Sequence, residues 1–134
     1  MKRIWFALVS MAIIFAACIV ELIWIENSTA TLTQSIDEII QAVENENEDE
    51  ANKLSDEEKA ELGKNLHSNW DSLHTILAAF VDHARLEDID QSIAVISECL
   101  KKEEESDFYI ESAKLKGQLE HLKDTELPTI SNIL

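Results

Sequence analysis

The chain has 134 residues with 27 acidic and 11 basic side chains, and its net charge of −16 excludes nucleic-acid binding driven by phosphate neutralisation. Only two Gly and one Pro occur, and apolar residues recur at helical spacing without alternating β-branched runs. These features predict an all-α protein.

The first expected element is an apolar stretch near the N-terminus. Residues 4–20 carry no charged side chain, and Trp5 and Trp24 flank the stretch 19 residues apart. A helix of that length rises about 28 Å, which matches a hydrocarbon core of about 30 Å. Indole rings favour the membrane–water interface. Residues 1–25 are therefore predicted to form a short cytoplasmic tip and a transmembrane anchor.

Lys2 and Arg3 precede the stretch, and no basic cluster follows it. Because positive charge favours the cytoplasmic side, residues 26–134 are expected to form one extracytoplasmic, acidic helical domain. Cys18 would then lie in the bilayer and Cys99 outside it, so the two thiols are not expected to pair.

Two processing events are alternatives to a retained anchor. Residues 28–30 (Ser-Thr-Ala) resemble a signal-peptide cleavage site, and residues 15–18 (Phe-Ala-Ala-Cys) loosely resemble a lipoprotein site at Cys18. The apolar run extends to Ile25 with one interruption at Glu21, whereas the apolar region of a signal peptide is about 7–15 residues. The length favours a retained anchor.

Glu21 lies one turn before Trp24, where a carboxylate is costly unless it reaches water or finds a partner. It is expected either to extend to the outer interface or to contact another membrane protein. Glu21 is therefore the candidate interaction residue of the anchor.

The anchor is followed by a first helix whose start is open. Seven residues share a narrow helical sector, which fits one helix continuous with the anchor: Leu22, Ile25, Thr29, Leu32, Ile36, Ile40 and Val43. Ser35 with Glu38 is a capping box that would instead start a new helix. Both readings fit the sequence.

Three more helices are expected. Ser55 followed by acidic residues 56–58 marks the start of a helix over Leu62, Leu66, Trp70, Leu73, Leu77 and Phe80. The next stripe is Leu86, Ile89, Ile93, Ile96 and Leu100, and the last is Phe108, Leu115, Leu119 and Leu122. The fourth helix is expected to end before Pro128, leaving a short apolar tail of Ile130, Ile133 and Leu134.

Short connections between these helices predict an antiparallel up-and-down bundle of about four helices. In that topology the acidic runs at residues 44–50 and 103–107 converge at the end far from the membrane. Clustered carboxylates attract calcium. No rigid turn gathers them around one ion, so diffuse cation attraction is expected rather than a specific site.

The histidines are the remaining candidate ligands. His67, Asp71 and His74 share one flank of the second helix and would need a further ligand to hold zinc or copper. His83 and His121 are expected at the membrane-proximal end, in or near the last turns of the second and fourth helices, beside Glu87 and Glu120. In that position imidazoles usually satisfy helix-end carbonyls, although they can act as a pH switch.

The order of several landmarks carries a family resemblance. A mid-helix Trp70 is followed by residues 80–83 (Phe-Val-Asp-His), Glu87, residues 119–121 (Leu-Glu-His) and residues 132–134 (Asn-Ile-Leu). The chain thereby resembles a family of small, uncharacterised, single-anchor membrane proteins of spore-forming Firmicutes, classed as a domain of unknown function. The resemblance implies a single-pass bacterial membrane protein with a helical domain and supplies no activity and no catalytic residues. Together with the predicted anchor and its orientation, the expected location is the bacterial cytoplasmic membrane.

No nucleophile elbow, phosphate-binding loop, zincin motif or EF-hand loop occurs in the sequence, so no enzymatic activity and no cofactor are expected. The favoured hypothesis is a non-enzymatic, membrane-tethered interaction or scaffold module whose partners are the bilayer and other membrane or envelope proteins. The alternative is a metal- or pH-responsive sensor that uses His83 and His121, or His67, Asp71 and His74.

Overall fold

The computed structural model describes residues 1–126, which form helices and short connections without a strand. The four α-helices are α1 (Lys2–Glu48), α2 (Asp56–Leu77), α3 (His83–Lys102) and α4 (Glu105–His121). A 3-10 turn, η1 (Glu50–Asn52), follows α1, and a π-helical segment, η2 (Leu122–Glu126), continues α4. The all-α expectation is confirmed. The expected helix end before Pro128 and the apolar tail of residues 130–134 lie outside the described residues.

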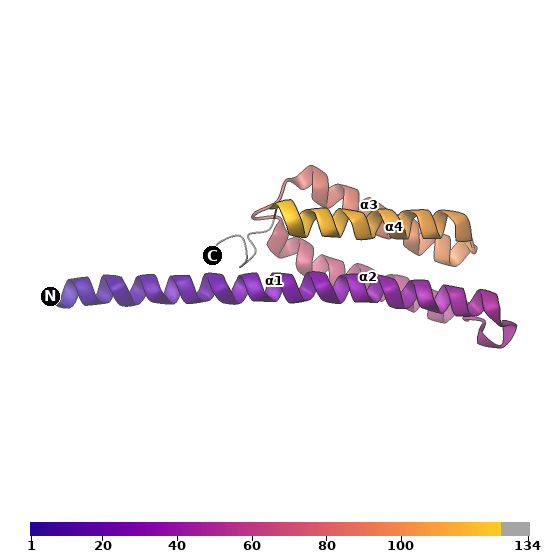
Figure 1. Ribbon diagram of the computed structural model, residues 1–134, viewed down its shortest axis with the longest axis horizontal. Coiled ribbons are helices and arrows are strands. Elements are labelled where there is room, and N and C mark those ends of the chain that lie inside the picture. Colours follow the sequence, from indigo (N-terminus) through magenta and orange to yellow (C-terminus); the bar gives the residue numbers. More distant parts are fainter. Residues whose placement is uncertain (127–134) are drawn as a thin grey trace.

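Helix α1 is one uninterrupted element of 47 residues, about 70 Å long at 1.5 Å per residue. The hydroxyl of Ser35 donates a 3.0 Å hydrogen bond to the Thr31 carbonyl one turn earlier, as it does inside a helix. Ser35 therefore does not cap a new helix. Of the two readings of this region, the structure adopts the continuous helix (Figure 1).

The two halves of α1 have different surroundings. Every residue from 1 to 21 is exposed, and Ile25 is the first buried residue. Beyond it, one face of α1 is buried through Thr29, Leu32, Ile36, Ile39 and Val43. The N-terminal part has a mean hydropathy of 2.6 over an 18-residue window and none of that window is buried. It is long and apolar enough to cross a membrane, a property that a signal sequence shares.

The second half of α1 packs in an antiparallel bundle with the other three helices (Figure 1). Each helix contacts the next one along the chain, and α4 also contacts α1, which closes the ring. The up-and-down order is confirmed. As a result, η1 and the α3–α4 turn lie at one end of the bundle, while the α2–α3 connection and the end of α4 lie at the other (Figure 1).

Local signals explain where α2 begins. Ser55 and Glu58 form the expected capping box, with Ser55 Oγ accepting from the Glu58 backbone N–H at 3.2 Å and Glu58 Oε2 accepting from the Ser55 N–H at 2.8 Å. The carboxylate of Glu58 serves as an acceptor in this box, which lowers its pKa. Two backbone donors at the helix start are thereby satisfied.

The predicted stripe of α2 is correct from Leu66 to Leu77 and wrong at Phe80. The helix ends at Leu77, and Phe80 lies in the α2–α3 connection with 58% of its surface exposed. Val81 is buried instead. Asp82 then caps α3 by accepting a 3.0 Å hydrogen bond from the Ala84 N–H.

Candidate functional site

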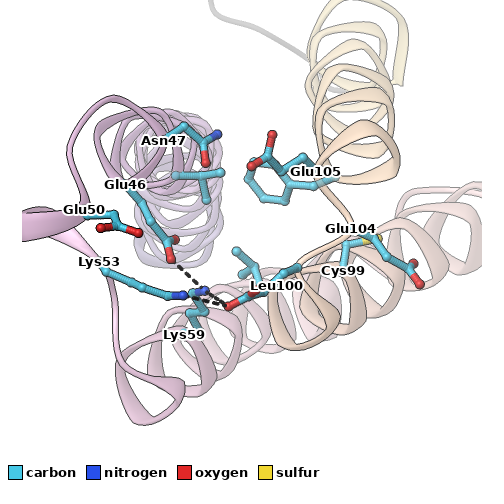
Figure 2. Close-up of a pocket in the computed structure, with 12 residues that line it drawn as sticks. Glu46, Asn47, Glu50, Lys53, Lys59, Cys99, Leu100, Glu104 and Glu105 are labelled. Atoms are coloured by element: carbon cyan, nitrogen blue, oxygen red, sulfur yellow. Dashed lines mark hydrogen bonds and ion pairs between the residues drawn. The ribbon is translucent and has the colours of Figure 1, made fainter.

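The candidate site lies at the end of the bundle farthest from the exposed half of α1. The end of α1, η1, the start of α2 and the α3–α4 turn surround a pocket of about 280 Å³ there (Figure 2). Both predicted acidic runs contribute to its lining, through Glu46 and Glu50 on one side and Glu103, Glu104 and Glu105 on the other. Their predicted convergence is confirmed. We call this region the acidic end.

A buried cation ties the acidic end together. Lys59, in the first turns of α2, is 4% exposed. Its Nζ lies 2.9 Å from Glu46 Oε1 on α1 and 3.0 Å from Glu103 Oε1 at the end of α3 (Figure 2). The ammonium thus joins three helices. Lys53 lies farther from the same Glu103 oxygen, at 4.0 Å, and is exposed.

The opposite charges in this cluster stabilise each other's ionised forms. Burial disfavours the charged form of Lys59, but hydrogen bonds and attraction from Glu46 and Glu103 outweigh burial, so the pKa of Lys59 is raised. The hydrogen bond and charge of Lys59, with a smaller contribution from Lys53, lower the pKa of Glu103. These contacts therefore hold Lys59 in its protonated form.

Glu103 occupies an unusual backbone position. Its φ of 58° and ψ of 33° place it in the left-handed region, directly after the last residue of α3. Glycine is the usual residue at this position because it has no Cβ to clash. Here the position is filled by a side chain that reaches back to Lys59.

Cys99 lies at the inner side of the pocket and is 3% exposed. Burial raises the pKa of its thiol, and the nearby carboxylates of Glu104 and Asp107 raise it further. A protonated, buried thiol is a poor nucleophile and a poor metal ligand. Cys99 therefore packs as a small apolar side chain of the core.

The acidic end carries more carboxylates than ammonium groups, and those of Glu50, Glu104 and Glu105 belong to exposed residues. Such a surface attracts cations or a basic protein surface and repels phosphates. Sequence reasoning identified the acidic runs and missed Lys59. The available signal was spacing, because Lys59 continues the buried stripe of Leu66 and Trp70 towards the start of α2.

The three candidate metal ligands on α2, His67, Asp71 and His74, do not converge on one point but form two separate contacts. His67 Nε2 lies 3.8 Å from Asp71 Oδ2 on the exposed flank of α2. His74 Nε2 lies 3.7 Å from Asp90 Oδ2 on α3 instead. Asp90 also accepts a hydrogen bond from the indole N–H of buried Trp70. His74 and Trp70 thus share a partner across the α2–α3 interface.

His83 and His121 lie at the opposite end of the bundle from the acidic end. His121 is the last residue of α4, as predicted, and lines a pocket of about 380 Å³ with Arg85 and Asp88. The expectation that His83 lies in or near the last turn of the second helix is wrong, because α2 ends at Leu77 and His83 is the first residue of α3. Within residues 1–126, no group of three or more His, Cys, Asp or Glu side chains is arranged to hold a metal ion.

Glu21 is exposed, on the part of α1 that precedes the bundle. Trp5 and Trp24 are exposed on the same helix, at 70% and 40%. These three candidate residues of the anchor are therefore exposed side chains on the part of α1 that precedes Ile25.

Fold and site together define a class: an all-α protein in which one helix joins an apolar N-terminal segment to an acidic four-helix bundle. The chain belongs to the family described as a domain of unknown function, DUF4363, whose sequence profile matches residues 21–133. The predicted resemblance to a domain of unknown function is thereby confirmed. No curated protein and no solved structure matched the chain.

Proposed function

We propose that the protein is a non-enzymatic, membrane-tethered interaction module of the bacterial cytoplasmic membrane. The first half of α1 crosses the bilayer, the N-terminus lies in the cytoplasm, and the bundle presents its acidic end to a basic surface of a membrane or envelope protein. The observation that carries the proposal is the undivided α1, apolar and exposed in its first half and buried in the bundle in its second.

The distribution of exposed apolar side chains supports the tether. Within residues 1–126, the large hydrophobic side chains exposed to solvent belong to residues 1–24, with two exceptions, Phe80 and Ile110. A contiguous apolar surface of this size is unfavourable in water and matches a lipid environment. The positive charges of Lys2 and Arg3 favour a cytoplasmic N-terminus.

The acidic end supports the choice of partner. Its carboxylates gather from three helices at the point farthest from the anchor, which gives a partner unobstructed access. Charge complementarity mainly contributes partner choice and association rate. The Lys59 contacts fix the helix ends that carry these carboxylates, so a partner meets an ordered surface.

Sidedness is tested in cells stripped of their wall, with a tag placed after Leu134. We expect alkaline carbonate to leave the protein in the membrane fraction and external protease to remove the tag. A tag that is digested only after lysis would contradict the orientation, and release by carbonate would contradict the tether.

The partner is tested by crosslinking in native membranes followed by mass spectrometry. We expect a reproducible partner with a basic surface, captured by the natural sequence and lost when Glu50, Glu104 and Glu105 are changed to Gln. The matched control changes Glu38, Glu87 and Glu120 to Gln, the same loss of charge away from the acidic end. Equal capture by both triple variants would contradict a role for the acidic end.

A further inference from the structure

The α2–α3 connection carries an apolar side chain that the bundle leaves uncovered. Phe80 is 58% exposed although the neighbouring Leu77 and Val81 are 0% and 6% exposed. The residues from Ile76 to Val81 include no charge. Phe80 thus lies at the tip of a short uncharged segment, on the surface of a strongly acidic protein.

The connection is ordered by backbone hydrogen bonds. The Phe80 N–H donates to the Leu77 carbonyl at 2.9 Å, and the Val81 N–H donates to the same oxygen at 2.8 Å. Burial of Leu77 and Val81 fixes the two sides of the turn. The ring of Phe80 is therefore presented outward by a defined turn.

The position of the connection relates it to the apolar half of α1. It lies at the end of the bundle that faces this half, at about the level of the middle of α1 along the long axis of the molecule (Figure 1). Ile25 is the first buried residue of α1, and Trp24, directly before it, is 40% exposed. Because α1 continues without a break through this boundary, the connection and the start of the apolar segment lie at a similar level along the long axis of the molecule (Figure 1).

We propose that Phe80 is a second membrane contact, inserted into the outer interface of the bilayer that holds the first half of α1. The inference rests on the proposed tether, because a bundle that begins at Ile25 brings its near end down to the level of the headgroups. An aromatic ring on an uncharged turn is well suited to the boundary between headgroups and acyl chains.

The charged side chains around the connection indicate which lipids this contact requires. Asp82, Arg85 and Glu87 belong to the connection or to the first turns of α3, and Lys123 and Asp124 belong to η2, which follows α4 at the same end of the bundle. This mixed, partly acidic surface offers no basic patch for anionic lipids. The contact therefore depends on apolar insertion and forms with zwitterionic lipid.

The test places a fluorescent label at single cysteines of the full-length protein in phosphatidylcholine vesicles. Cys18 and Cys99 are changed to Ala, and the label is attached at Phe15→Cys, Ala79→Cys or Ile110→Cys in turn. Ala79 is exposed beside an intact Phe80, Phe15 reports on the apolar segment, and Ile110, 61% exposed on α4, is the apolar control away from the connection. Nitroxide lipids quench labels that touch the bilayer.

We expect quenching at positions 15 and 79 and none at position 110. Phe80→Ser abolishes quenching at position 79 and Phe80→Leu retains it, with helix content by circular dichroism unchanged in both. Quenching at 15 without quenching at 79 overturns the inference and leaves the tether intact, whereas no quenching at 15 overturns the tether itself. A blue-shifted label at 79 that lipid nitroxides do not quench indicates a protein contact and also overturns the inference.

Discussion

Lys59 donates a 3.0 Å hydrogen bond to Glu103, whose φ of 58° is the only positive value among the described non-glycine residues. The contact joins residues 44 positions apart at a helix end that would suit glycine. A left-handed conformation costs a residue with a Cβ about 1–2 kcal/mol. The acidic end therefore combines a favourable ion pair with an unfavourable backbone.

Two substitutions at Glu103 separate these effects. Both Glu103→Ala and Glu103→Gly remove the contact with Lys59, but only glycine relieves the backbone. We expect the glycine variant to be the more stable by about 1 kcal/mol in urea unfolding of the full-length protein in detergent. At Lys102, the last residue of α3, we expect the reverse order, because glycine weakens a helix. The same order at both positions would contradict a strained Glu103.

The lysine contacts predict a pH dependence. The lowered pKa of Glu103 means that its contribution is present above the ordinary value of 4.5 and is lost as the pH falls below it. The raised pKa of Lys59 means that its contribution is present below 10.5 and is lost as the pH rises above that value. We expect the stability difference between the natural protein and Lys59→Met to be largest between these limits. A difference that does not change from pH 7 to pH 3 would contradict the ion pair.

Replacing each of the two glycines by alanine is expected to change stability differently. A Cβ at Gly63 would lie 3.1 Å from Ser97 Oγ and 3.3 Å from Ser97 Cβ across the α2–α3 contact, whereas a Cβ at Gly117 would meet nothing within 4 Å. We expect Gly117→Ala to increase the free energy of unfolding by about 0.5–1 kcal/mol. Gly63→Ala should gain less or lose stability, because Ser97 must move. Equal gains in urea unfolding would show that α2 and α3 separate easily at this point.

Trp70 is fully buried and donates to Asp90, so its removal leaves a cavity and takes away one of the two contacts of Asp90. We expect Trp70→Ala to cost about 3–5 kcal/mol. Ile110→Ala, at a side chain that is 61% exposed, should change stability by less than about 0.5 kcal/mol. Thermal unfolding followed by circular dichroism measures both variants. A small effect at Trp70 would mean that the α2–α3 interface is not the centre of the core.

The histidines predict a negative result with zinc. His67 and His74 each face a single carboxylate, in different contacts. We therefore expect stoichiometric zinc to leave the thermal midpoint of the purified protein unchanged, with a chelator as the control. A rise that disappears in His67→Ala or in His121→Ala would establish a metal site and revive the sensor hypothesis.

Features that depend on neighbours in sequence were predictable. The start of α2 follows from Ser55 and Glu58, and the buried Leu and Ile positions of α3 follow from apolar spacing alone. The acidic end was also predictable, because short connections force an up-and-down order that brings the two acidic runs together.

Features that depend on distant partners were not predictable from pattern alone. The spacing of α2 places Lys59 on the buried face of the helix, but the two carboxylates that surround its ammonium come from other helices, and nothing local to α2 indicates them. Phe80 continues the helical spacing of α2, but the chain leaves the helix after Leu77 without a Gly or Pro to mark the end. The local sequence around Ser35 fits both the start of a new helix and the interior of a continuous one. The packing of the following turns against the bundle favours the continuous helix.

The unbroken α1 also couples the orientation of the bundle to that of the apolar segment. Once its first half lies in a bilayer, the bundle cannot reorient at a joint, because the helix continues through the boundary to Glu48. A tilt of about 20° carried over the 24 residues from Ile25 to Glu48 displaces the far end sideways by about 12 Å. Changes in bilayer thickness would thus be transmitted to the acidic end as motion.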